Sequence, residues 1–129
     1  MCKKGVHSIK QGFHELERTN CDACGLCIVD CPTGALRLVG QEMTAADVVR
    51  EVIRDEPFYK GGGGITCSGG ECTLQPQFLT AVLEDAKEVG LNTAVDTCGA
   101  APSVVFKRIL PLTDAFLYDI KIITPAAHR

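Results

Sequence analysis

The sequence predicts an α/β protein in which parallel strands follow a short cysteine-rich segment. Five of the eight cysteines lie within the first 40 residues. From residue 41 onward, strand-like and helix-like segments alternate, and the expected strands are almost entirely apolar. This alternation is typical of βα units with a parallel sheet, and apolar strands are expected where both sheet faces are covered. We therefore predict two parts, residues 1–40 and 41–129.

Bulk properties narrow the class of protein. The chain has 129 residues, about one domain, and its net charge of −3 argues against nucleic acid or a membrane surface as the main partner. No apolar run is long enough to predict a membrane span, and the N-terminus lacks the apolar core of a secretory signal. We expect a cytoplasmic protein, and in a reducing compartment closely spaced cysteines are more often metal ligands than disulfides.

The first part carries the most specific motif. Cys21, Cys24, Cys27 and Cys31, followed by Pro32, form the C-x2-C-x2-C-x3-C-P run of bacterial ferredoxins. Zinc sites usually pair two Cys-x2-Cys knuckles that lie farther apart. The run therefore predicts a [4Fe–4S] cluster. Short strands are expected beside it, at residues 13–16 and 35–39.

The fourth ligand of this cluster has two candidates. In two-cluster ferredoxins, the last cysteine of each run binds the other cluster. By that rule Cys21, Cys24 and Cys27 need an upstream cysteine, which is Cys2, and Cys31 faces a second cluster. The alternative is that Cys31 closes the cluster and Cys2 is a free thiol. We favour the first interpretation. His7 and His14, between Cys2 and the run, are expected at the surface rather than as ligands.

The second part is predicted element by element. Thr44 is the expected N-cap of a helix, with Asp47 three residues on, and Pro57 ends the segment. A strand follows at 65–67, and a second helix runs from Pro76 to a cap at Gly90. The remaining elements are a strand at 93–95, a helix at about 103–110 and a strand at 115–118. Thr124 and Pro125 predict the start of another helix. Three parallel strands make an incomplete sheet, so we expect a fragment that is incomplete at both ends of this part, with the ferredoxin-like part incomplete at its N-terminus.

Polar groups follow each of the three predicted strands, at what should be the same edge of the sheet. The three strand ends are followed by Gly69-Gly70-Glu71, by Asp96-Thr97 and by Asp119-Ile120-Lys121. Carboxyl ends of parallel strands are where α/β proteins place their ligands. Bare glycines let a ligand lie against the backbone, Glu71 suits an ammonium group, and Lys121 suits a carboxylate. Together these groups predict a site for an amino acid moiety, and Asp96, Thr97 and Asp119 offer oxygens for a small cation.

The ordered set of these motifs behind a ferredoxin-like segment resembles the glycyl-radical-enzyme activating enzymes of the radical S-adenosylmethionine superfamily. The resemblance covers nearly the whole chain. It implies a partial (β/α) barrel and places S-adenosylmethionine at Gly69, Gly70, Glu71, Asp119 and Lys121, with Asp96 and Thr97 near a bound cation. It also implies anaerobic function, a glycyl radical enzyme as partner, and an electron donor of the flavodoxin or ferredoxin type.

One departure from the family is plain. Its radical cluster is held by C-x3-C-x2-C, and no such spacing occurs in this chain. We therefore expect no catalytic residue here and no S-adenosylmethionine cleavage by the chain alone. Cys67, Cys72 and Cys98 are expected as small buried hydrophobic residues. The alternative functions are a ferredoxin-type electron-transfer module with an α/β docking domain, and a truncation product without a role of its own.

Overall fold

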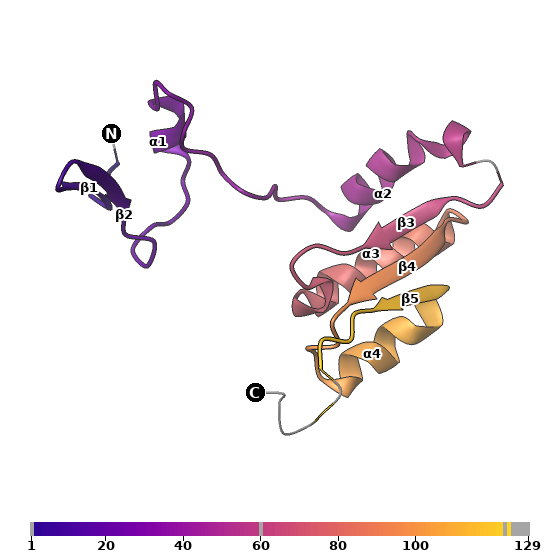
Figure 1. Ribbon diagram of the computed structural model, residues 1–129. Helices are drawn as coiled ribbons and strands as arrows, with labels where there is room; N and C mark the ends of the chain where they lie inside the picture. Colours follow the sequence, from indigo (N-terminus) through magenta and orange to yellow (C-terminus); the bar gives the residue numbers. More distant parts are fainter. Residues whose placement is uncertain (1, 60, 123, 125–129) are drawn as a thin grey trace. The chain divides into compact units, whose positions relative to one another are not determined.

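A computed structural model describes residues 2–59, 61–122 and 124 of the chain (Figure 1). The chain divides into two compact units, Met1–Glu42 and Met43–Arg129, and each is described by itself. Within the described ranges, no helix is both long and apolar enough to cross a lipid bilayer. The helix predicted to start at Thr124 and Pro125 lies outside these ranges.

The first unit contains a β-hairpin and one short helix. Strands β1 (His7–Lys10) and β2 (Phe13–Leu16) pair in antiparallel fashion, with His7 opposite Leu16 and Ile9 opposite His14. Gln11 and Gly12 join them with φ angles of 51° and 83°. Left-handed conformation at both residues fits a two-residue hairpin turn. Helix α1 (Leu26–Val29) lies inside the cysteine run.

The prediction of a strand at residues 35–39 is wrong. The strand predicted at residues 13–16 is present as β2. Residues 35–39 form no strand, and Val39 is 91% exposed. Strand β2 pairs with β1. The apolar stretch at residues 35–39 therefore has no neighbouring strand to pair with. Among the described residues of this unit, only Val6 counts as a buried hydrophobic residue. So small a core stabilises little, which suits a fold that depends on bound metal.

Over its described residues, the second unit is a three-stranded parallel sheet with three α-helices (Figure 1). Along the chain, its elements are α2 (Ala45–Ile53), β3 (Gly64–Cys67), α3 (Pro76–Glu88), β4 (Asn92–Thr97), α4 (Ser103–Ile109) and β5 (Ala115–Tyr118). The strand order is β3-β4-β5, and both pairings are parallel. The predicted βα alternation is therefore confirmed. Short 3₁₀ turns occupy Glu56–Phe58, Cys72–Leu74 and Leu110–Leu112.

Local sequence explains where the helices begin and end. The Thr44 hydroxyl accepts a hydrogen bond from the Asp47 backbone, and the Asp47 carboxylate accepts one from the Thr44 backbone, which forms a capping box. Pro76 opens α3, where its missing N–H costs nothing. Gly90, with φ of 79°, follows the end of α3 and takes the left-handed conformation that terminates many helices.

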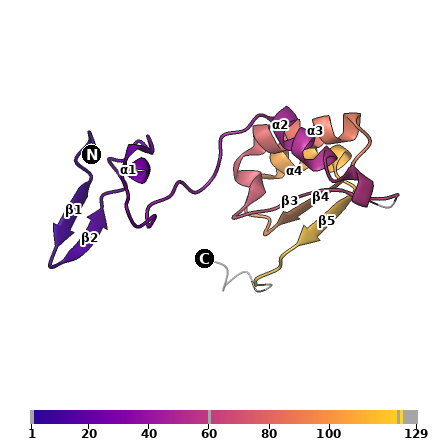
Figure 2. The ribbon, with the colours of Figure 1, turned by 90° about the horizontal axis from the view of Figure 1, so that it is seen from above.

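All three helices lie on one face of the sheet (Figure 2). Leu79 and Leu83 of α3, Val95 of β4 and Ile109 of α4 form a buried core cluster. Along β4, Thr93, Val95 and Thr97 are buried, while Asn92 and Asp96 are exposed. The expectation that both faces are covered is wrong for the described residues. The uncovered face carries Thr66, Ala94, Asp96, Ala115 and Leu117.

Candidate functional site

The cysteine run forms a loop that turns through left-handed residues. Ala23 and Gly25 have φ angles of 53° and 78°, and Gly25 caps α1. The turn directs the Ala23 amide toward the Cys21 sulfur, at 3.4 Å. Backbone N–H groups aimed at sulfur are the contacts that stabilise metal-bound thiolates. The sequence run therefore folds into a loop whose backbone already donates to one of its own thiols.

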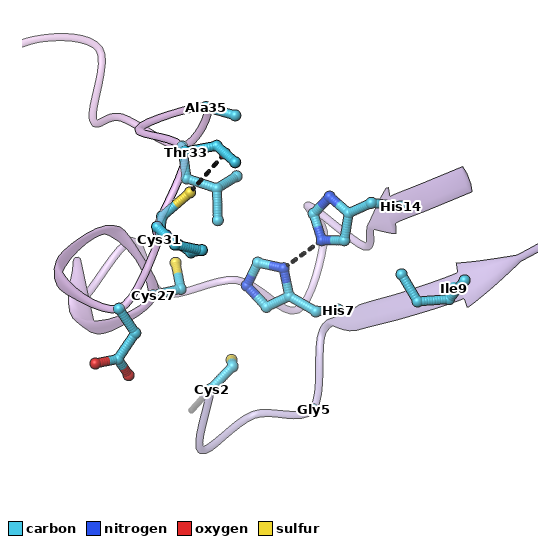
Figure 3. Close-up of a pocket in the computed structure, with 12 residues that line it drawn as sticks. Cys2, Gly5, His7, Ile9, His14, Cys27, Cys31, Thr33 and Ala35 are labelled. Atoms are coloured by element: carbon cyan, nitrogen blue, oxygen red, sulfur yellow. Dashed lines mark hydrogen bonds between the residues drawn. The ribbon is translucent and has the colours of Figure 1, made fainter. Parts of the chain in front are cut away.

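The five thiols of the first unit line two cavities, and Cys2 and Cys27 line both. Four line one cavity of about 270 Å³: Cys2, Cys21, Cys24 and Cys27. Cys31 lines the other cavity, of about 910 Å³, together with Cys2 and Cys27 (Figure 3). Cys2 precedes the hairpin in the sequence, and the fold brings it to the same cavity as the run although 18 residues separate it from Cys21. In the described parts of the chain, no three His, Cys, Asp or Glu side chains converge closely enough to hold a single metal ion.

Two thiols of this unit are shifted toward the thiolate form. Hydrogen bonding with the Thr33 side chain, aided by the Leu36 backbone, lowers the pKa of Cys31 to about 7. Hydrogen bonds from the backbone of Val6 and Lys4 lower the pKa of Cys2. Thiolates are the form of cysteine that binds iron and zinc. The donor set is all sulfur, and four of its five members lie on one short glycine-containing loop, so it fits an iron–sulfur cluster.

In the second unit, the Glu71 side chain ties the end of β3 to the end of β4. Its Oε1 accepts hydrogen bonds from the hydroxyls of Thr73, at 2.6 Å, and Thr97, at 2.7 Å. Its Oε2 accepts from the backbone N–H of Cys98 at 2.9 Å and from the Cys98 thiol at 3.0 Å. The Thr73 backbone donates to Oε1 as well. These donors occupy about all the lone pairs that a carboxylate offers.

The hydrogen bonds keep Glu71 ionised. Partial burial of the carboxyl group acts to raise its pKa, but the bonds from Cys98, Thr73 and Thr97 outweigh burial and lower it to about 2. A carboxylate in this setting carries a fixed negative charge at the strand ends at any physiological pH. An ammonium group of a ligand would share these oxygens with the internal donors.

Asp119 and Lys121 lie beside the same strand ends. The Asp119 backbone donates to the Thr97 carbonyl oxygen at 3.0 Å. The Lys121 ammonium pairs with the Asp119 carboxylate, and that contact raises the pKa of Lys121. Both residues line a cavity of about 280 Å³ with Cys98, Gly99 and Tyr118. The structure thus brings the ends of β4 and β5 together around one small recess.

Gly69, Gly70 and Asp96 are the other residues predicted for this site. A side chain added at Gly69 or Gly70 would meet no other atom within 4 Å, so the backbone there is open to a ligand. Asp96 lies on the uncovered sheet face, opposite in direction to its neighbour Thr97, because side chains alternate along a strand. Thr97 points to the helix side and bonds Glu71, so it does not share a face with Asp96.

The three remaining cysteines behave differently from one another. Cys67 and Cys72 pack against the core cluster but are half-buried rather than fully buried, and burial raises the pKa of Cys67 to about 11. The expectation is wrong for Cys98, which is exposed and bonded to Glu71. Sequence reasoning also missed Thr73. The only signal for it was its position two residues after Glu71, the spacing at which a carboxylate side chain accepts from a backbone amide.

Comparisons with known proteins define the class first. Residues 15–37 match the family described as "4Fe-4S binding domain". That stretch holds Cys21, Cys24, Cys27 and Cys31. The first unit therefore contains a stretch that is similar to 4Fe-4S binding domains, which supports an iron–sulfur cluster.

The particular family follows from whole-chain similarity. The chain is 38% identical to the choline trimethylamine-lyase activating enzyme of Oleidesulfovibrio alaskensis, over 99% of this chain and 43% of that protein. It is 40% identical to the trans-4-hydroxy-L-proline dehydratase activating enzyme of Clostridioides difficile, over 92% of this chain and 49% of the relative. It is 36% identical to the pyruvate formate-lyase 2-activating enzyme of Escherichia coli, over 84% of this chain and 39% of the relative.

The resemblance predicted from the motifs is confirmed: this chain is a relative of the glycyl-radical-enzyme activating enzymes. It spans less than half the length of each of these three relatives.

Proposed function

We propose that this chain is part of a glycyl-radical-enzyme activase, a radical S-adenosylmethionine oxidoreductase that works in the cytoplasm of an anaerobic cell. The observation that carries the proposal is identity of 36–40% to three activating enzymes over 84–99% of the chain. In such an enzyme, one electron from an iron–sulfur cluster would cleave a C–S bond of S-adenosylmethionine to give methionine and a deoxyadenosyl radical, and a glycine of the partner would lose a hydrogen atom to that radical. The partners are a glycyl radical enzyme and a flavodoxin- or ferredoxin-type electron donor.

The first unit's role is to hold iron–sulfur clusters. We assign Cys2, Cys21, Cys24 and Cys27 to one [4Fe–4S] cluster, and their shared cavity supports this assignment over closure by Cys31. Cys31, which lines the other cavity, is assigned to a second cluster in the parent protein. These thiolates and the loop amides fix the cluster and tune its potential.

The second unit's role is to bind the methionine end of S-adenosylmethionine. Gly69 and Gly70 give access to the backbone, Glu71 provides a fixed negative charge for the ammonium group, and Lys121 provides a positive charge for the carboxylate. Asp119, which pairs with Lys121, and Thr97, which bonds Glu71, belong to the same strand-end rim, whereas Asp96 lies on the opposite face of β4. Helices on one sheet face support a barrel fragment, because a (β/α) barrel has its helices outside and its strands inside.

Iron content after anaerobic reconstitution tests the ligand set. We expect about four irons per chain, loss of the cluster in Cys24→Ala and Cys2→Ala, and retention in Cys31→Ala. Cys67→Ala, which removes a thiol from the second unit, is the matched control. Retention in Cys2→Ala with loss in Cys31→Ala would overturn the assignment of the fourth ligand. Preference of the unmodified chain for zinc over iron and sulfide would overturn the cluster itself.

Substrate chemistry tests the rest of the proposal. Because C-x3-C-x2-C is absent from the chain, we expect S-adenosylmethionine to bind through the second unit but not to be cleaved. Deoxyadenosine formed after reduction with dithionite would contradict this expectation.

The second candidate function is an electron-transfer module whose α/β unit docks a partner. The same absence of C-x3-C-x2-C favours it. Equilibrium dialysis against S-adenosylmethionine separates the two, since only the activase fragment should bind it.

A further inference from the structure

His7 contains a buried nitrogen that has no partner. Its Nε2 is the one buried side-chain nitrogen or oxygen atom, among the residues that the structure describes, that makes no hydrogen bond. Leaving such a polar group unpaired is costly, and an unpaired group in a native fold usually indicates an unseen ion, water or ligand.

The hairpin fixes the direction of the His7 ring. His7 pairs with Leu16 and His14 pairs with Ile9, so the two histidines lie diagonally on one face of the hairpin. Their rings stack with centroids 5.0 Å apart. His7 Nδ1 and His14 Nε2 are 2.8 Å apart and share a hydrogen bond. Since this bond uses Nδ1, Nε2 is the nitrogen left for another partner.

The ring lines the larger cavity of the first unit, among thiols. Figure 3 shows the His7 ring with one edge toward Cys2, Cys27 and Cys31 and its other nitrogen bonded to His14. All three cysteines line that cavity with His7 and His14. Cys2 and Cys27 also line the smaller cavity to which we assigned the complete cluster. A nitrogen in this position therefore faces the sulfurs of two proposed cluster ligands.

We propose that His7 donates an Nε2–H hydrogen bond to a cysteine sulfur of the iron–sulfur cluster, and that His14 positions it. This inference rests on the proposed cluster ligation by Cys2 and Cys27. The bond to sulfur requires the tautomers in which His14 Nε2–H donates to His7 Nδ1 and the proton of His7 is on Nε2. A thiolate sulfur attracts that N–H, whereas it would repel the lone pair of the other tautomer.

The bond changes the electron affinity of the cluster. Reduction adds negative charge to the iron–sulfur core, and a donor to a sulfur stabilises that charge. His7 therefore raises the reduction potential, while the cysteines alone hold the iron. Loss of the bond lowers the potential without removing the cluster.

The test compares His7→Leu with His7→Gln in the full chain, reconstituted anaerobically with ferrous iron and sulfide. Both variants remove the imidazole, but glutamine keeps an N–H donor. At the midpoint potential of the unmodified protein, we expect the ratio of reduced to oxidised cluster to fall about tenfold in His7→Leu, a shift of about 59 mV for one electron. His7→Gln should lose much less. Ser8→Ala, on the opposite face of the hairpin, is the control and should not change the potential.

Iron and sulfide content is measured on every variant. A potential in His7→Leu equal to that of the unmodified protein, at full iron content, overturns the inference and leaves the proposed cluster intact. Strong ¹⁴N coupling in pulsed electron paramagnetic resonance of the reduced protein would also overturn it, because His7 would then be an iron ligand. If the unmodified chain takes up no cluster, the proposed function fails and this inference fails with it.

Discussion

Glu71 is predicted to stabilise the second unit through its charge, and Glu71→Gln should remove most of that contribution. The five donors to its carboxylate lower the pKa from the ordinary 4.5 to about 2. Taken at full weight, that shift is worth roughly 3.5 kcal/mol, since one pKa unit corresponds to about 1.4 kcal/mol. The side chain is only partly buried, so solvent screens it, and we expect a loss of about 1–2 kcal/mol at pH 7.

The stabilisation by Glu71 should depend on pH. Glu71 has a depressed pKa in the folded state, so its contribution is fully present above the unfolded pKa of about 4.5 and is lost as pH falls toward about 2. The difference in unfolding free energy between the unmodified protein and Glu71→Gln should therefore shrink across that window. Urea denaturation followed by circular dichroism at pH 7, 4 and 2.5 measures it.

Glu84→Gln is the matched control, because it removes the same charge from an exposed position on α3. We expect it to change the unfolding free energy by less than about 0.5 kcal/mol. The reasoning is refuted if Glu71→Gln is as stable as the unmodified protein at pH 7. A difference that stays constant down to pH 2.5 would refute it too, because the loss would then come from packing rather than charge.

Two further predictions concern the core and the strand-end recess. Leu83 is fully buried in the core cluster, so Leu83→Ala should lower the unfolding free energy by about 2–5 kcal/mol in the same denaturation assay; a loss below about 1 kcal/mol would mean that the core is looser than described. Gly99 has φ of 77°, a left-handed conformation that strains any residue with a Cβ, whereas the Tyr118 ring that a Cβ would meet is 56% exposed and can move away. Gly99→Ala should therefore lower the melting temperature by several degrees, whereas Gly62→Ala, which has open space and no left-handed φ, should not.

The sequence predicted the local features well because their causes are local. The capping box at Thr44 and Asp47, the Pro76 start of α3 and the Gly90 cap each depend on residues within one turn. The cysteine run is also local, and its match to the 4Fe-4S domain family supports the cofactor that its spacing predicted. The alternation of strands and helices sufficed to predict a parallel sheet, which the structure confirms.

What the tertiary structure decided depends on contacts between distant residues. Apolar strands occur in sheets with one covered face and in sheets with two, so strand composition could not distinguish these cases. The packing of α2, α3 and α4 placed all three helices on one face of the sheet. The hairpin register brought His7 to His14, although each alone was expected at the surface. Glu71 was predicted to meet a ligand, but only the folded chain set Thr97 and Cys98 against it, 26 and 27 residues away in sequence. The sequence determines the chemistry of each side chain. Strand register and packing determine which groups contact it, and therefore whether its pKa shifts or a buried nitrogen lacks a partner.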